Sequence, residues 1–192
     1  MQAWQDRDVS SVAVASVELL KARGVEVTPG LSSDDLHRLQ DELGVSLAAE
    51  HAEFLSLGVP HGPRWPDWRA LQQDDLDRIM RRPVDGVLFD IEVNGVWPRS
   101  WAARPDGPAE RAALAERALA TAPVLVPIYG HRYLPAGEWP APVPVFSVHQ
   151  SDVISYGTDL LDYVRREFDG ARGPRTTPLV TVPFWSELAD RG

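Results

Sequence analysis

Residues 123–168, PVLVPIYGHRYLPAGEWPAPVPVFSVHQSDVISYGTDLLDYVRREF, combine several strand patterns with a run of polar side chains and a closing helix. Three segments of this stretch have strand patterns: 124–128, 143–148 and 153–156. The first is a short apolar run typical of a buried strand, and side chains of the second alternate between two faces. A helix is expected next, with Thr158 as its N-cap and with Leu160, Val164 and Phe168 on its apolar face. Strands and helix must therefore share one core.

Upstream of this stretch the apolar residues recur at helical spacing. Helices are predicted over residues 9–20, 33–43, 47–55, 74–82 and 108–121. Pro83 is expected to end the fourth of these, because proline interrupts helical hydrogen bonding. His51 falls on the apolar side of the third helix, which favours a core or boundary histidine over a metal ligand.

Residues 87–95, VLFDIEVNG, carry the cleanest alternating pattern and predict a strand. In a strand Phe89, Ile91 and Val93 share one face, while Asp90 and Glu92 lie on the other with Asn94. A solvated sheet face explains these polar residues, and an acidic recognition strip for a partner is the alternative. An oxygen-ligand metal site is the weakest interpretation, because side chains about 7 Å apart along a strand do not close on one ion.

Two pairs of tryptophans lie in predicted loops. Trp65 and Trp68 either pack over the core or form an exposed aromatic anchor for a partner. Trp97 and Trp101 follow the predicted strand. Residues 171–192 are expected to be a partly flexible tail whose end, with Trp185, docks back on the body.

Composition excludes several classes of function. The chain has 192 residues, a net charge of −9 and no cysteine, so thiolate chemistry and sulfur-based zinc sites are excluded. The negative charge argues against direct nucleic-acid binding and against an anionic membrane surface. No apolar run approaches the roughly 20 residues that span a bilayer, and Asp6 and Asp8 outweigh Arg7 where a signal peptide needs positive charge. We expect a cytoplasmic protein without a cofactor or metal.

A polar set lies beside the predicted strand ends: His131, Arg132, His149 and Asp152, with Tyr133. A histidine with a carboxylate can act as a general base, and an arginine can hold an anion. No nucleophile elbow, phosphate loop or dinucleotide fingerprint accompanies the set. The structural interpretation, which we favour, is that Arg132 pairs with an acid such as Asp152 or Glu92.

The order of the segments resembles the SUKH superfamily, which includes fungal regulators of cell-wall synthesis and bacterial immunity proteins that neutralise toxins. The resemblance covers roughly residues 30–170, and looser similarity extends to VPFWSEL. Its pieces are LSLGVPHG, WPDWRAL, VLFDIEVNG, LVPIYGHRYLP, PVFSVHQSDVISYG and DLLDYVRREF. The chain departs from the family at Leu57-Gly58, where members commonly have Asn-Gly, and in the helix over 108–121, which is similar to an insertion of actinobacterial relatives.

The resemblance implies an α+β fold, with helices around a mainly antiparallel sheet, as a single domain over residues 1–170. It also implies a non-catalytic module that binds a protein partner, which for an immunity protein is a basic, nuclease-like toxin. The candidate partner-binding residues are Trp68, Asp90, Glu92, Trp97, Trp101, His131, Arg132 and Asp152. The alternatives are a small hydrolase or ligand-binding protein using His131, Arg132 and Asp152, and a weak homodimer through the tryptophan loops.

Overall fold

The computed structural model describes residues 8–171 and 177–190. Residues 1–7, on which the signal-peptide expectation rests, and 172–176, part of the predicted tail, lie outside the described residues. The described elements are α1 (Val9–Ala22), β1 (Val27–Pro29), α2 (Ser33–Leu43), α3 (Ala49–Leu57), β2 (Gly58–Pro60), α4 (Gln73–Val93), α5 (Pro108–Leu119), β3 (Leu125–Tyr129), β4 (Arg132–Pro135), β5 (Val145–His149), β6 (Asp152–Gly157), α6 (Leu160–Phe168) and α7 (Trp185–Ala189). The predicted α+β class is confirmed.

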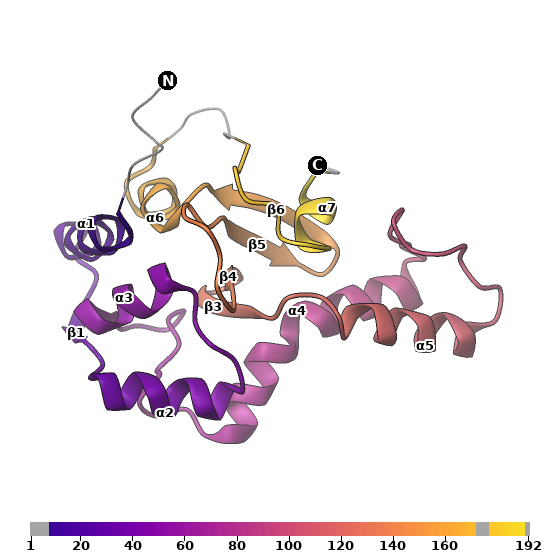
Figure 1. The fold of residues 1–192 in the computed structure, drawn as a ribbon, viewed down its shortest axis with the longest axis horizontal. Helices are drawn as coiled ribbons and strands as arrows, with labels where there is room; N and C mark the ends of the chain where they lie inside the picture. The colour runs from indigo at the N-terminus through magenta and orange to yellow at the C-terminus, as the bar shows by residue number, and fades with distance from the viewer. Residues whose placement is uncertain (1–7, 172–176, 191–192) are drawn as a thin grey trace.

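The central sheet is an antiparallel meander in the order β3-β4-β5-β6. The three predicted strands are confirmed as β3, β5 and β6. β4 was not predicted, because its four residues follow the Gly130 turn too closely to show a pattern of their own. β1 and β2 pair in a separate two-stranded sheet beside the N-terminal helices (Figure 1).

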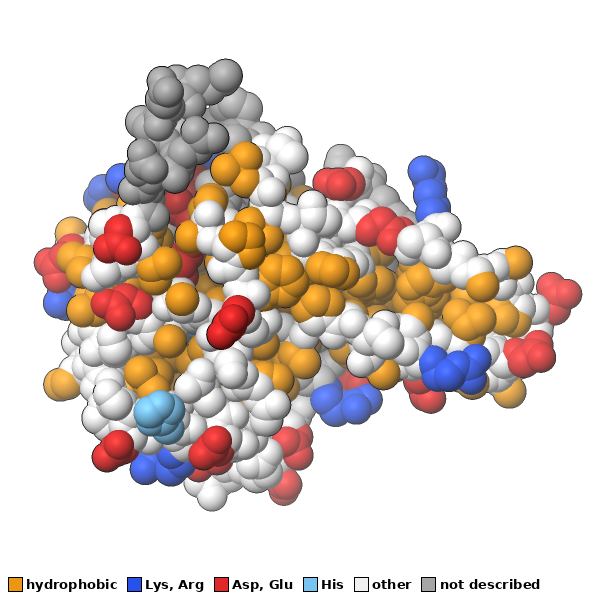
Figure 2. All heavy atoms as spheres, viewed as in Figure 1, with side chains coloured by type: hydrophobic (Ala, Val, Ile, Leu, Met, Phe, Trp, Pro, Cys, Tyr) orange, Lys and Arg blue, Asp and Glu red, His pale blue; other side chains and the backbone are white. Residues whose placement is uncertain are grey.

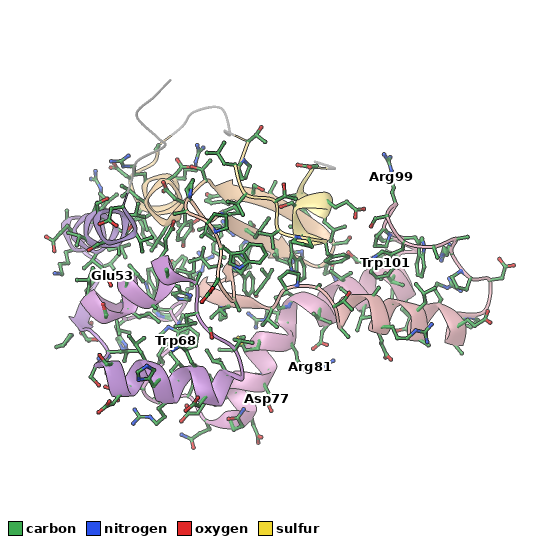
Figure 3. All side chains as sticks on the ribbon, in the orientation of Figure 1. Glu53, Trp68, Asp77, Arg81, Arg99 and Trp101 are labelled. Atoms are coloured by element: carbon green, nitrogen blue, oxygen red, sulfur yellow. The ribbon has the colours of Figure 1, made fainter. Side chains whose placement is uncertain are left out.

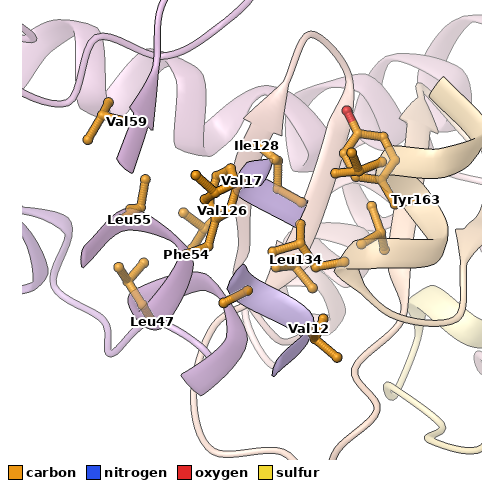
Figure 4. Close-up of a cluster of buried hydrophobic side chains, with 14 of the residues drawn as sticks. Val12, Val17, Leu47, Phe54, Leu55, Val59, Val126, Ile128, Leu134 and Tyr163 are labelled. Atoms are coloured by element: carbon orange, nitrogen blue, oxygen red, sulfur yellow. The ribbon is translucent and has the colours of Figure 1, made fainter. Parts of the chain in front are cut away.

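The sheet separates two hydrophobic cores, because side chains alternate along each strand. Val126, Leu134 and Val145 face the first core, which they share with α1, α2, α3 and α6 (Figure 4). Leu125, Phe146, Val148 and Val153 face the second core with α4, α5 and α7. Figure 1 shows α4 and α5 side by side, extending away from the sheet. The sheet is therefore the middle layer that holds the two groups of helices together.

The prediction of a strand over residues 87–95 is wrong, because these residues lie at the end of the 21-residue helix α4 or just beyond it. The helix continues through Pro83, so the predicted stop is wrong as well. Val87 and Ile91, one helical turn apart, are buried in the second core, whereas Phe89 and Val93 are 47% and 60% exposed. The packing of this i, i+4 pair offsets the hydrogen bond that proline removes.

Side chains at the helix starts set two boundaries. Ser32 and Asp35 form a capping box at α2, one residue before the predicted start. Asp159, rather than Thr158, caps α6, and its carboxylate accepts from the Asp162 N–H at 2.6 Å. The predicted N-cap is thus wrong by one residue.

Helix α7, in the described part of the tail, docks on the body, as expected. Trp185 is buried in the second core, and its indole N–H donates to the Pro123 carbonyl at 2.7 Å. This bond joins α7 to the segment that enters β3.

Candidate functional site

Asp90 and Glu92 do not form an acidic strip, because two positions apart on a helix they point in nearly opposite directions. Asp90 is buried and accepts hydrogen bonds from the Ser151 N–H at 2.9 Å, the Ser151 hydroxyl and the Asn94 amide. Burial acts to raise the pKa of Asp90, but these hydrogen bonds outweigh it and lower that pKa. Asp90 thus anchors the β5–β6 turn to α4, and of the two only Glu92 is exposed to a partner.

The tryptophans do not form one surface. Trp68 is buried, with its ring 6.2 Å from that of His51, which is buried as predicted. Trp97 and Trp101 pack edge to face at 5.2 Å, and Trp101 stacks on Phe184 at 5.7 Å. In Figure 3 the labelled Trp68 and Trp101 lie on opposite sides of the molecule. Of the three candidate tryptophans, Trp97 and Trp101 are half-buried and available for partial contact with a partner, whereas Trp68 is not.

Arg132 pairs with an acid, as expected, but the acid is Glu167 on α6 rather than Asp152 or Glu92. Its guanidinium donates to Glu167 at 3.1 Å and to the Ser147 hydroxyl at 3.0 Å. It also lies over the Tyr156 ring, 4.2 Å from the centroid. Because Arg132 is 8% exposed, these contacts make it a structural link between β4, β5, β6 and α6.

His131 and Asp152 lie at the ends of hairpins. The His131 ring is 6.5 Å from that of His149, and His149 pairs in register with the exposed Asp152. Burial, together with the charges of Arg132 and Arg64, lowers the pKa of His131. His131, Arg132 and Asp152 line neither of the two cavities described below. The geometry thus brings His131 close to Arg132 but does not gather the three residues around either cavity.

A groove that the sequence did not reveal lies between α4, α5 and the entry to β3. It encloses about 610 Å³, and we call it the α4–α5 groove. Its apolar lining includes Met80, Val84, Leu88, Leu119, Val124 and Trp185. Figure 2 shows hydrophobic side chains gathered in a band over α5 and the segment that leads to β3. The groove was missed because its residues come from four separate stretches of the chain: 43–45, 80–88, 116–125 and residue 185.

The charge at the rim of the α4–α5 groove is negative. Two charged residues line it, Arg81 and Glu116. Arg81 donates to Asp85 at 3.1 Å, so its charge is paired, and Figure 3 shows it projecting from α4. Glu116 has no basic partner among the residues that the structure describes. The α4–α5 groove is therefore an apolar surface with an unpaired carboxylate at its edge.

The chain was compared with family models, with curated proteins and with solved structures, and nothing matches in any of the three. Within residues 8–171 and 177–190, no helix is both long enough and apolar enough to cross a membrane. The same residues contain no group of three or more histidine or acidic side chains placed to hold a metal ion.

Proposed function

We propose that the chain is a non-catalytic protein-binding module of the SUKH type, and that its partner docks in the α4–α5 groove. The observation that carries the proposal is the groove itself, with apolar walls left open to solvent beside an unpaired Glu116. Val124, on its lining, is 40% exposed. Exposed apolar surface with a polar rim is typical of protein-interaction sites.

The chemistry of the groove selects a basic partner. A cleft between two helices accommodates an apolar side-chain row from a partner helix, and Glu116 favours lysine or arginine beside that row. The net charge of −9 also steers a basic protein toward the chain. A basic, nuclease-like toxin domain, the partner that the SUKH resemblance implies for immunity proteins, has this chemistry. We place the protein in the cytoplasm.

The test uses two variants that alter the groove and two that alter exposed sites elsewhere. Val124→Asp puts a charge in the apolar lining, and Glu116→Lys reverses the charge at the rim. Val14→Asp is the matched apolar control, since Val14 on α1 is 45% exposed, and Glu18→Lys, at another exposed position of α1, is the control for charge. A partner is captured from the native lysate, identified by mass spectrometry, purified and titrated against all five proteins by calorimetry.

The proposal requires a basic partner that binds the wild type at 1:1 stoichiometry. Its affinity falls at least about tenfold with Val124→Asp and with Glu116→Lys, and stays within about twofold with both controls. A partner bound equally by the two groove variants contradicts the assigned surface. An acidic partner contradicts the assigned chemistry.

A further inference from the structure

A second cavity lies on the other side of α4, between the loop over residues 62–67, the helix and the β3–β4 turn. It encloses about 450 Å³ and shares no lining residue with the α4–α5 groove. Trp65, Ile79 and Pro127 contribute apolar walls, and Arg64 and Arg82 contribute positive charge. One acid, Asp67, lines it. In a protein of net charge −9, a cavity with two guanidinium groups is a local reversal of sign.

Arg64 is held in place by its neighbours. Its carbonyl accepts from the Gly130 N–H at 2.8 Å, and its guanidinium carbon lies 4.4 Å from the Tyr129 ring centroid. Gly130 has a φ of +58°, and a Cβ there would lie 2.7 Å from an Arg64 guanidinium nitrogen. Because glycine has no side chain, the Arg64 guanidinium can occupy the space beside Gly130. Glu167 is 3.9 Å from Arg64 and is engaged more closely by Arg132.

The second positive group of the cavity, Arg82, is exposed. No ion pair joins it to a carboxylate within the described part of the chain. It approaches the Tyr133 hydroxyl, whose pKa is raised by burial against the effect of Arg82. Tyr133 therefore keeps its proton and can donate it to an anion. The aromatic wall is also fixed, because Trp65 stacks on Phe168 at 5.7 Å with an interplanar angle of 12°.

We propose that this cavity binds a small organic carboxylate, with its apolar body against Trp65 and its carboxylate between Arg64 and Arg82. Guanidinium groups bind carboxylates through paired, charge-assisted hydrogen bonds, and apolar walls favour an organic anion over an inorganic one. The volume suits a molecule of small-metabolite size. The site is independent of the protein partner, because the two cavities have separate linings.

The probes are phenylacetate, its uncharged analogue phenylacetamide, and inorganic phosphate. Each is titrated into the full-length protein labelled with ¹⁵N, while the Gly130 amide and the Trp65 indole N–H signals are followed. Arg82→Gln removes one cation from the cavity. Arg78→Gln is the matched control, because Arg78 lies one turn earlier on α4, is exposed and pairs with Asp75 outside the cavity.

We expect saturable shifts at Gly130 and Trp65 with a Kd for phenylacetate of about 1 mM, a value suited to so small a probe. Phenylacetamide and phosphate bind at least about tenfold more weakly, and Arg82→Gln weakens phenylacetate about tenfold while Arg78→Gln leaves it unchanged. Equal affinity for the acid and the amide overturns the proposal. So does phosphate binding as tight as that of phenylacetate, or the absence of saturation at about 20 mM.

Discussion

The adjacent residues Glu50 and His51 are expected to give the stability of the fold opposite pH dependences. In the wild-type protein these two contributions cancel. Both residues are 1% exposed. The Glu50 carboxylate accepts from the Val143 and Leu160 N–H groups, each at 3.2 Å, and so joins α3 to the segment before β5 and to α6. Burial raises the pKa of Glu50 from 4.5 to about 7, although these hydrogen bonds oppose it. Burial lowers the pKa of His51 from 6.5 to about 4.

Each difference between folded and unfolded pKa corresponds to about 3 kcal/mol of pH-dependent stability. The Glu50 contribution is fully present below pH 4.5 and is lost as pH rises through about 7. The His51 contribution is fully present above pH 6.5 and is lost as pH falls through about 4. Between pH 4.5 and 6.5 the folded state carries a proton on Glu50 and the unfolded state carries one on His51. The two states therefore bind the same number of protons at these two residues. These two residues together therefore add little slope there.

Single substitutions separate the two contributions. On acidification from about pH 7.5 to 4.5, the stability of Glu50→Gln falls by about 3 kcal/mol relative to wild type, whereas that of His51→Gln rises by a similar amount. Urea denaturation, followed by circular dichroism at constant ionic strength, measures both differences, and the double variant regains the wild-type slope. The test compares how the free energy of unfolding changes with pH. A constant loss of stability caused by a substitution therefore does not affect it. Variants whose curves run parallel to wild type, or deviate in the same direction, refute the reasoning.

Three further substitutions test the fold through urea denaturation. Asp90→Ala removes the acceptor that holds the β5–β6 turn and lowers the free energy of unfolding by about 2 kcal/mol. Glu92→Ala, the control, changes it by less than about 0.5 kcal/mol. Equal effects of the two substitutions contradict the anchoring role of Asp90. Gly30→Ala prevents native packing, because its Cβ would lie 1.8 Å from the Ser56 carbonyl oxygen, and a cooperative transition like that of wild type argues against this contact. Arg132→Gln lowers the free energy of unfolding by about 2 kcal/mol, because the half-buried Glu167 loses the closer of its two guanidinium partners and keeps only Arg64. An unchanged free energy of unfolding contradicts the link to α6.

The fold could be predicted wherever one periodicity dominates. Strands β3, β5 and β6 and helix α6 follow directly from their patterns. Residues 87–93 carry two periodicities at once, since Phe89, Ile91 and Val93 alternate while Val87 and Ile91 are one helical turn apart. Tertiary packing favours the helical one, because the helix places both Val87 and Ile91 in the second core. A single sequence does not contain that information.

The sites could be predicted less well, because their contacts join distant residues. The sequence indicated that Arg132 pairs with an acid but not that Glu167, on α6, is the partner. The α4–α5 groove and the cavity beside Trp65 depend on how α4 lies against the sheet, and α4 is the element whose second half was predicted wrongly. Burial of Asp90 against the β5–β6 turn also follows from that packing.

The most direct test of the proposed binding function is hydrogen exchange of the protein with and without its basic partner. We expect slower amide exchange in residues 80–88 of α4 and in residues 116–125, from the last turn of α5 to the start of β3, because these segments line the groove. The loop over residues 62–67, on the other side of α4, should exchange as in the free protein. Protection confined to that loop, to the β5–β6 turn or to α1 would contradict docking in the α4–α5 groove.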